Sequence, residues 1–499
     1  MKKLLRSIVV LALLWASPGH LAAADAIAAA PRFSEPPTFT LSPDVPLAGV
    51  LSFNSDRPCT AIVYLVDGTT RTAVPTPAEP ATQHQIRVLG LRADREYGLD
   101  VRITSGDRAV ASDPLAFRTA PLPDILPTLR VTRSQPERME PGVTLFSLFR
   151  WESDRADNSF GYFVAVDAAG DVVWYYAIGA PAAAAHRLHN GDFQFIHGVP
   201  PKFIRRIDPL GNTIREFHAV GLGDAPRAGA ISVDVDTFHH DFAPQPDDSL
   251  LALSTEVREL EQFPLNVARP RRGFGPAHVV GDVVAHVLPD GRVQQRWALL
   301  DILDPQRVTW SSHDSFWDER AYNHIEQGTK DWSHANTVVR DPADGGLVLS
   351  LRHQDAVVKI DAETSEVRWI LGTRANWRGE LARKVLQPTA RLEWPFHQHG
   401  VKFTPHGTLL MFDNGNLRAI PPARPMPPTE AYSRAVEYAI DEDAMSVTEV
   451  WSYGGPDDDD RFYSPFLCDA DWLPQTGNVL VTDGAHVTDD NAQPVNNPP

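Results

Sequence analysis

Hydrophobic and polar residues alternate in short runs along most of the chain, and residues that favour turns separate these runs. Alternation with a period of two is the pattern of a β-strand with one buried face. Segments with the longer periodicity of an amphipathic helix are few, whereas proline (43) and glycine (32) are abundant among the 499 residues. The sequence therefore predicts an all-β protein with many turns.

Residues 31–120 contain five such runs at short spacing, among them TAIVYLVD and HQIRVLGL. Short alternating strands with turns between them predict a small β-sandwich domain. The segment LRADREYGLDVRI resembles a fibronectin type III domain, with Tyr97 in the place of its tyrosine corner. We expect no chemistry from this module, which would pack against a neighbour or dimerise, so a homodimer is one candidate assembly. A linker over residues 121–140 follows.

From residue 141 to residue 499 the chain repeats in two alternating phases. One phase is an apolar strand pair around a polar turn, as in HGVKFTPHGTLLMFDNG, and the other is a hairpin that ends on an aromatic residue. The aromatic residues at this position are Trp174, Phe217, Trp297, Trp369 and Trp451. Four-stranded units repeated radially form a β-propeller. We expect six blades, at roughly 141–177, 186–217, 239–298, 334–371, 397–453 and 465–486.

The first 24 residues have the three parts of a secretory signal peptide. Three basic residues precede an apolar core at residues 8–16, and three alanines at 22–24 form a small-residue cleavage site. The apolar core is too short for a membrane anchor, although an uncleaved anchor is the alternative interpretation. We expect an exported, periplasmic protein without a membrane anchor.

Removing the three basic residues of the signal peptide lowers the formal charge from −18 to −21 (−18 − 3). A chain this acidic has no general basic face, which argues against nucleic acid and anionic membranes as partners. An anion-binding site would have to be built locally, from a few cationic side chains.

Polar side chains interrupt apolar strands between residues 331 and 416. Strand alternation puts His334 and Asn336 on one face, and His397 and His399 on one face. Buried histidine and arginine are uncommon and need partners, so together with Arg352 these residues predict a shared polar cavity. Residues that open the innermost strands face a propeller's channel, and here they are His186, His240, His334, His399 and Cys468.

Five motifs in this half of the chain are HHDF, DWSHAN, SLRHQ, QHGVKF and FDNGN, and together they resemble the bacterial arylsulfate sulfotransferases. The resemblance covers about residues 230–465. It implies a six-bladed propeller that moves a sulfuryl group from a phenolic sulfate to an acceptor phenol, with neither a nucleotide donor nor another cofactor. By this resemblance the catalytic residues are His399, His334, Arg352 and His240, and the substrate-binding residues include Asn336.

Two histidines beside these positions leave alternatives open. His239 and His240 point to opposite faces of their segment, and we expect His240 to line the site because it opens the HDF sequence. His397 shares a strand face with His399, so we expect it to contribute to substrate binding.

The types of residue in this cluster also suit sulfuryl transfer when they are considered independently of the family resemblance. A sulfate monoester has no proton to remove, so catalysis depends on positioning and on stabilising oxygen charge, as in phosphoryl transfer. Arg352 offers a planar fork for two oxygens. Neutral His399 would attack sulfur and become sulfohistidine, and the acceptor would bind afterwards, which predicts ping-pong kinetics.

Two other functions compete with this one. A metal-dependent hydrolase would use His240, Asp241, His334 and His399 as ligands, although Arg352 would oppose a cation. A non-catalytic propeller that binds aromatic anions would keep the same residues without a covalent step. The long loop at 304–333 is either a wall for phenolic rings or a packed lid, and its aromatic residues are Trp310, Phe316, Trp317 and Tyr322.

Overall fold

The computed structural model describes residues 30–150, 160–198, 202–459 and 461–485, together with residues 488, 494 and 495. The predicted signal peptide lies outside the described residues. Within the described part, no helix is long and apolar enough to cross a membrane. The chain divides into two compact units, Met1–Thr40, Val50–Arg87 and Glu96–Arg118 in the first, and Leu41–Gly49, Val88–Arg95 and Thr119–Pro499 in the second.

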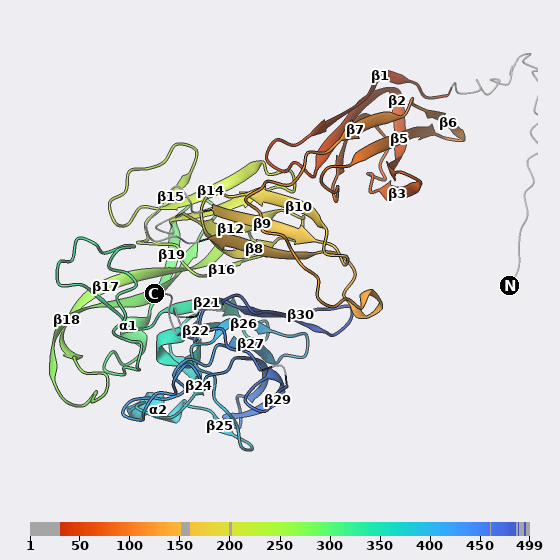
Figure 1. Cartoon of the computed structure of the whole chain (residues 1–499). Helices are drawn as coiled ribbons and strands as arrows, with labels where there is room; N and C mark the ends of the chain where they lie inside the picture. The colour runs from red at the N-terminus through yellow and green to blue at the C-terminus, as the bar shows by residue number, and fades with distance from the viewer. Residues whose placement is uncertain are drawn as a thin grey trace, which may run out of the picture. The chain divides into compact units, whose positions relative to one another are not determined.

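The first unit is a set of seven paired strands (Figure 1, red to orange). In chain order they are β1 Phe33–Leu41, β2 Gly49–Asp67, β3 Thr70–Val74, β4 Ala81–Val88, β5 Glu96–Ser105, β6 Arg108–Ala111 and β7 Leu115–Arg118. On β5 the buried residues are Tyr97, Leu99, Val101 and Ile103, which is the period of two that the sequence predicts. The fibronectin type III topology stays a prediction.

The second unit is all-β, with a propeller-like arrangement of sheets (Figure 1). Its first sheet contains β8 Thr144–Arg150, β9 Phe160–Val166 and β10 Val172–Ala177. Its second contains β11 Ala182–Arg187, β12 Phe193–His197, β13 Phe203–Ile207, β14 Thr213–Ala219 and β15 Ile231–Val233. Its third contains β16 Phe242–Pro244, β17 Leu250–Pro264, β18 Phe274–Val287, β19 Val293–Ala298 and β20 Lys330–Asp331.

The later sheets follow the same sequential order. The fourth contains β21 Ala335–Arg340, β22 Leu347–Leu351, β23 Ala356–Ile360 and β24 Val367–Gly372. The fifth contains β25 Gln387–Pro388, β26 His399–Phe403, β27 Leu409–Asp413, β28 Arg434–Asp441 and β29 Ser446–Gly454. The hairpin β30 Asp469–Trp472 and β31 Val479–Thr482 comes last. The short helices are η1 Pro136–Arg138, α1 Leu299–Ile302, η2 Arg352–Gln354 and α2 Gly379–Arg383.

The number of blades is smaller than the sequence predicts. Five sheets in the described residues have three or more strands, so the structure shows five blades rather than six. The sixth predicted unit, at 465–486, forms only the β30–β31 hairpin within the described residues. The repeat count was wrong by one because this unit has the sequence of a single hairpin.

The repeated aromatic residues connect neighbouring blades. The indole N–H groups of Trp174, Trp297 and Trp369 donate to Pro209 O, Ala362 O and Glu442 Oε1, each on the following blade. All three indoles are buried, and each buried indole removes a large apolar area from water. At the equivalent position of the fifth blade, Trp451 is 38% exposed. The repeat therefore stabilises the contacts between blades.

We expect Trp369→Ala to lower the free energy of unfolding by about 3–5 kcal/mol, because it opens a cavity and removes the hydrogen bond to Glu442. Trp451→Ala is the matched control, since it changes the same repeat position where the side chain is exposed. Its effect should be below about 1 kcal/mol. Urea unfolding followed by circular dichroism measures both, and equal losses would contradict the inter-blade role.

Candidate active site

Four innermost strands place one residue each at an equivalent position. The last paired residues before their hairpin turns are Pro244, Arg340, Phe403 and Trp472. Four positions earlier in the sequence, on or just before each strand, stand His240, Asn336, His399 and Cys468. Neighbouring strands touch in the order β16, β21, β26 and β30, so these residues follow one another along the inner edge of the sheets.

His334 does not hold the equivalent position that the sequence predicts for it, because Asn336 does. His334 and His240 both have a left-handed backbone, with φ of 47° and 53°. This conformation costs a non-glycine residue on the order of 1–3 kcal/mol and is concentrated at functional sites. Here it brings the two imidazoles together, with ring centroids 4.6 Å apart at 65°.

His399 opens β26 at an irregularity in the strand pairing. Gly400 follows it with φ of +64°, and a Cβ there would lie 2.1 Å from Asp469 Oδ1. Any other residue here would strain the backbone and displace the Asp469 side chain. The strand is thus bent directly after the imidazole.

The protonation of His399 follows from its partners. Its Nδ1 lies 2.6 Å from Asn414 Oδ1 and 3.0 Å from His397 O. Asn414 is oriented by its own Nδ2, which donates to Ser464 O and Leu467 O at 2.8 and 3.2 Å. Both neighbours of Nδ1 are therefore acceptors, so Nδ1 carries the proton and Nε2 keeps its lone pair. Burial, and next the charge of Arg352, lowers the pKa of His399 to about 3, so the ring is neutral.

His334 has a carboxyl group behind it instead of an amide. Its Nδ1 contacts Asp331 Oδ2, and Trp317 Nε1 donates to Asp331 Oδ1 at 3.2 Å. Burial raises the pKa of Asp331 well above its usual value, and burial also lowers the pKa of His334 well below its usual value. Both shifts favour an uncharged pair. In that pair the carboxyl proton faces Nδ1, so His334 presents an Nε2–H donor.

Arg352 is a buried cation without a carboxylate partner among the described residues. Its Nη1 donates to His353 Nε2 at 2.7 Å and its Nη2 to Pro465 O at 3.4 Å, whereas its Nε has no partner there. His353 accepts because its Nδ1–H donates to Asp331 O at 2.7 Å. Burial lowers the pKa of Arg352 from its usual value, but a guanidinium stays charged. An unpaired buried guanidinium is a candidate anion-binding group.

Phe316 is the residue of the 304–333 loop that reaches this cluster. Its ring lies 5.0 Å from that of His334 and 5.7 Å from that of His240. Arg320 covers it, with Cζ 4.0 Å from the ring centroid. Trp317 is fully buried against His239, with ring centroids 4.9 Å apart. The loop is thus packed for the most part and contributes one aromatic wall.

Two predicted binding residues bond to protein groups. Asn336 Nδ2 donates to Gln398 O at 2.7 Å and so supports the main chain before His399. His397 is 1% exposed, with Nε2 2.7 Å from Ser311 Oγ and Nδ1 2.8 Å from Asp355 Oδ1. The structure therefore brings together His240, His334, Arg352 and His399, and places His397 behind them.

Three residues of the site were missed by the sequence interpretation. Asp331 and Asn414 lie inside the DWSHAN and FDNGN motifs, and Asp282 interrupts the apolar run HVVGDVVAHV. Each was visible as a polar residue in or beside an apolar strand. The sequence does not show which imidazole each one contacts. Asp331 meets His334 within one motif through a local turn, whereas the contacts of Asn414 with His399 and of Asp282 with His239 join different strands or segments.

The cluster does not suit the metal-hydrolase alternative. Asp331, His334 and His353 offer ligand atoms within 4.8 Å of one another. However, His353 Nε2 already accepts from Arg352, whose charge opposes a cation. Asp241, the carboxylate of the alternative ligand set, instead accepts from Val338 N and lies 3.1 Å from His186 Nε2.

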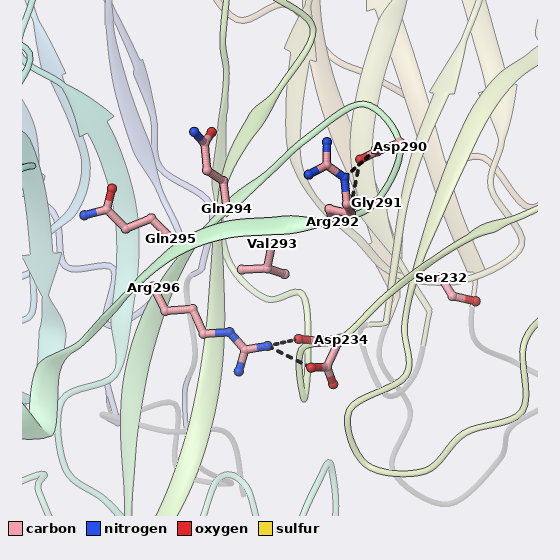
Figure 2. Close-up of a pocket in the computed structure, with 9 residues that line it drawn as sticks. All are labelled: Ser232, Asp234, Asp290, Gly291, Arg292, Val293, Gln294, Gln295 and Arg296. Carbon is pink, nitrogen blue, oxygen red and sulfur yellow. Dashed lines mark hydrogen bonds and ion pairs between the residues drawn. The ribbon is translucent and has the colours of Figure 1, made fainter.

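A surface hollow of about 660 Å³ lies beside β19 (Figure 2), and its lining residues include none of these histidines. Its charged side chains are already paired: Arg296 Nη2 lies 3.1 Å from Asp234 Oδ2, and Arg292 Nε lies 2.7 Å from Asp290 Oδ2. Neither arginine that lines the hollow is therefore left unpaired to bind an anion.

Comparisons with known proteins identify a matching family. The family model described as Arylsulfotransferase (ASST) matches residues 128–497. The arylsulfate sulfotransferase AssT of Escherichia coli is 32% identical over 225 residues, which are 37% of this chain and 36% of that protein. AssT of Lelliottia amnigena is 32% identical over 229 residues, 38% of this chain and 37% of that protein. The chain thus matches little more than a third of the length of these relatives.

Solved structures resemble the chain only distantly. A protein of unknown function from Bacteroides caccae has a TM-score of 0.32 and 10% identity, covering 79% of this chain and 93% of that one. A catalytically inactive virginiamycin B lyase from Staphylococcus aureus has a TM-score of 0.28 and 9% identity, covering 81% of this chain and 88% of that one. At such scores neither similarity assigns a function.

We expect His399 to stay neutral, with its proton on Nδ1, from about pH 5 to about pH 8, where an ordinary histidine changes charge. The reason is its lowered pKa of about 3 and the acceptor pair at Nδ1. ¹⁵N NMR of histidine-labelled protein measures both properties, with His399→Gln for assignment. A signal from His399 that titrates near the usual pKa would contradict the assignment.

Proposed function

The chain belongs to the arylsulfotransferase family, and we propose that it transfers a sulfuryl group from a phenolic sulfate ester to an acceptor phenol without a nucleotide sulfate donor. The main support is one juxtaposition at the site. Arg352 is a buried cation without a carboxylate partner among the described residues, and His399 beside it presents an unprotonated Nε2. The first group suits a sulfate anion, and the second suits attack on its sulfur.

The donor sulfate binds through groups that need an anion. Arg352 donates from its guanidinium to the sulfate oxygens, and His334 adds its Nε2–H. The aryl ring lies against Phe316, whose own ring faces both His334 and His240. The same contacts stabilise the charge that spreads over the oxygens in the transition state.

In the first half-reaction His399 Nε2 attacks sulfur, and the bond from sulfur to the phenolic oxygen breaks. The product is sulfohistidine, and its positive charge stays on a ring whose Nδ1–H donates to Asn414 Oδ1 and His397 O. The leaving group is a phenoxide, whose conjugate phenol has a pKa near ~10, whereas an alkyl alcohol is a far weaker acid. The site therefore selects aryl sulfates.

In the second half-reaction an acceptor phenol takes the place of the first. Its oxygen attacks sulfur, the bond from sulfur to Nε2 breaks, and His399 returns to its neutral form. One phenol leaves before the next binds, so the kinetics are ping-pong.

We further propose a periplasmic location, from the signal-peptide pattern of residues 1–24. The N-terminal unit is proposed to be a fibronectin type III-like module that supports homodimer formation. Neither role involves the catalytic cluster.

We expect brief mixing with 4-nitrophenyl sulfate, without an acceptor, to add the mass of one sulfuryl group to His399. Intact-mass analysis with peptide mapping measures the adduct. It should be absent in His399→Ala and discharged by added phenol. A folded wild-type protein that neither gains mass nor releases nitrophenol would instead be a binder of aromatic anions.

Arg352→Lys should lower kcat/KM for the donor by about 10²-fold or more, because a lysine cannot reproduce the two-pronged contact with sulfate oxygens. Arg296→Lys is the matched control, since that arginine is exposed and pairs with Asp234 away from the site. Steady-state assays with 4-nitrophenyl sulfate measure both. Equal activity of the two variants would remove Arg352 from the mechanism.

A further inference from the structure

A chain of three titratable side chains runs from the catalytic cluster into the core. His240 Nδ1 lies 2.9 Å from His239 Nδ1, and His239 Nε2 lies 3.3 Å from Asp282 Oδ1. His239 is 1% exposed and Asp282 is 2% exposed. His239 Nε2 and Asp282 Oδ1 are both buried and make no hydrogen bond among the described residues, so each can pair with the other across 3.3 Å. Buried titratable groups in contact with one another are often found at functional sites, so we expect these three side chains to have a function.

The contacts allow two complete arrangements of protons. When Asp282 is ionised, His239 donates from Nε2 to the carboxylate and accepts at Nδ1 from His240 Nδ1–H, so His240 Nε2 is unprotonated. When Asp282 is protonated, each hydrogen bond reverses, and His240 Nε2 carries a proton. The contact between the two Nδ1 atoms requires one proton in either case. The arrangements differ by one proton, and the difference is expressed at His240 Nε2.

We propose that His239 and Asp282 form a concerted proton relay through which His240 takes the proton of the acceptor phenol and returns it to the departing donor phenol. This inference rests on the proposed sulfuryl transfer and assigns two positioning residues to it. In this role His240 is the catalytic residue, since it faces the cluster, and His239 and Asp282 act through it.

The relay balances over one catalytic cycle. In the first half-reaction the phenoxide that leaves sulfur takes the proton from His240 Nε2; a proton passes from His239 Nδ1 to His240 Nδ1, and Asp282 gives its proton to His239 Nε2. In the second half-reaction the acceptor's O–H proton goes to His240 Nε2 while its oxygen bonds to sulfur. The His240 Nδ1 proton then passes to His239 and the His239 Nε2 proton to Asp282. One proton thus leaves and returns without help from water.

The surroundings of His240, His239 and Asp282 suit both arrangements of protons. Burial raises the pKa of Asp282 to about 7, against hydrogen bonds from Ser333 and from the Ala335 N–H, so the carboxyl can be present in either form near neutral pH. Burial, followed by His239, His399, Arg352 and Arg320, lowers the pKa of His240 well below its usual value. A proton gained by His240 is therefore passed inward. Asp282 is the carboxyl group at the end of the His240–His239 contact and can take that proton.

The comparison with His399 supports this division of roles. The group behind His399 is the amide of Asn414, which cannot accept a proton, whereas the group behind the His240–His239 pair is a carboxyl. An imidazole that carries the sulfuryl group must keep its Nδ1 proton, and an imidazole that moves protons must be able to pass one on.

The test separates the two half-reactions with Asp282→Asn. Sulfation of His399 by 4-nitrophenyl sulfate, whose leaving group is acidic and needs little proton transfer, should stay within about threefold of wild type. Discharge of the adduct to phenol should slow at least about tenfold, the scale of a lost general base. Discharge to the more acidic 4-cyanophenol should slow far less. Rapid mixing followed by intact-mass analysis measures all three rates.

Asp241→Asn is the matched control, because its carboxylate lies beside His240 in sequence but bonds to His186 and Val338. This variant should not slow discharge to phenol more than discharge to 4-cyanophenol. His239→Gln should repeat the acceptor selectivity of Asp282→Asn, and thermal unfolding shows whether each variant is folded. Equal slowing of every step, or no slowing, in a folded variant would overturn the relay.

The wild-type protein provides a test that needs no folded variant. Discharge to phenol in mixtures of H₂O and D₂O should depend on deuterium content with a curved profile, because several protons move together. A linear profile would mean that a single proton moves and would overturn the relay. If no adduct forms on His399 in the wild type, the proposed transfer itself fails; if the adduct forms and the profile is linear, only the relay fails.

Discussion

The buried guanidinium of Arg352 is the constraint on which the rest of the site depends. A cation taken out of water needs compensation, yet its hydrogen bonds go to a neutral imidazole and a backbone carbonyl. Burial, with the charge of Arg352 as a further cause, lowers the pKa of His240, His334 and His399, so the neighbouring imidazoles remain neutral. In a chain with a formal charge of −18, this is how a local anion site can exist.

Three neutral imidazoles have different functions here because different groups stand behind them. His399 has an amide, His334 has a carboxyl group, and His240 has a second histidine that leads to a carboxyl group. Each partner occupies Nδ1 and thereby decides what Nε2 can do: keep a lone pair, donate, or change between the two. The chemistry of the cluster therefore lies as much in the residues behind the rings as in the rings.

The packed sheets hold the site residues in this arrangement. His240, His334 and His399 stand at the beginnings of innermost strands that contact one another directly, and Arg352 follows β22 in η2. Buried indoles join successive blades at their outer strands. Strained backbone at His240 and His334 is held in place by these packed sheets. Sites on rigid elements keep their geometry better than sites on loops, and the long loop adds the ring of Phe316 to this cluster.

The sequence by itself determined the strands, the repeat and the members of the cluster. Period-two alternation records which face of a strand is buried, and the motifs around His240, His334, Arg352 and His399 stand where those strands begin or end. Only the tertiary structure decided how these residues are used. It shows five blades rather than six, puts Asn336 rather than His334 at the repeated position, and moves His397 behind the site. The reason is physical: alternation records only which face of a strand is buried, whereas the irregularity after His399, the left-handed backbone at His240 and His334 and the geometry of each Nδ1 contact are set by how the packed sheets hold the backbone.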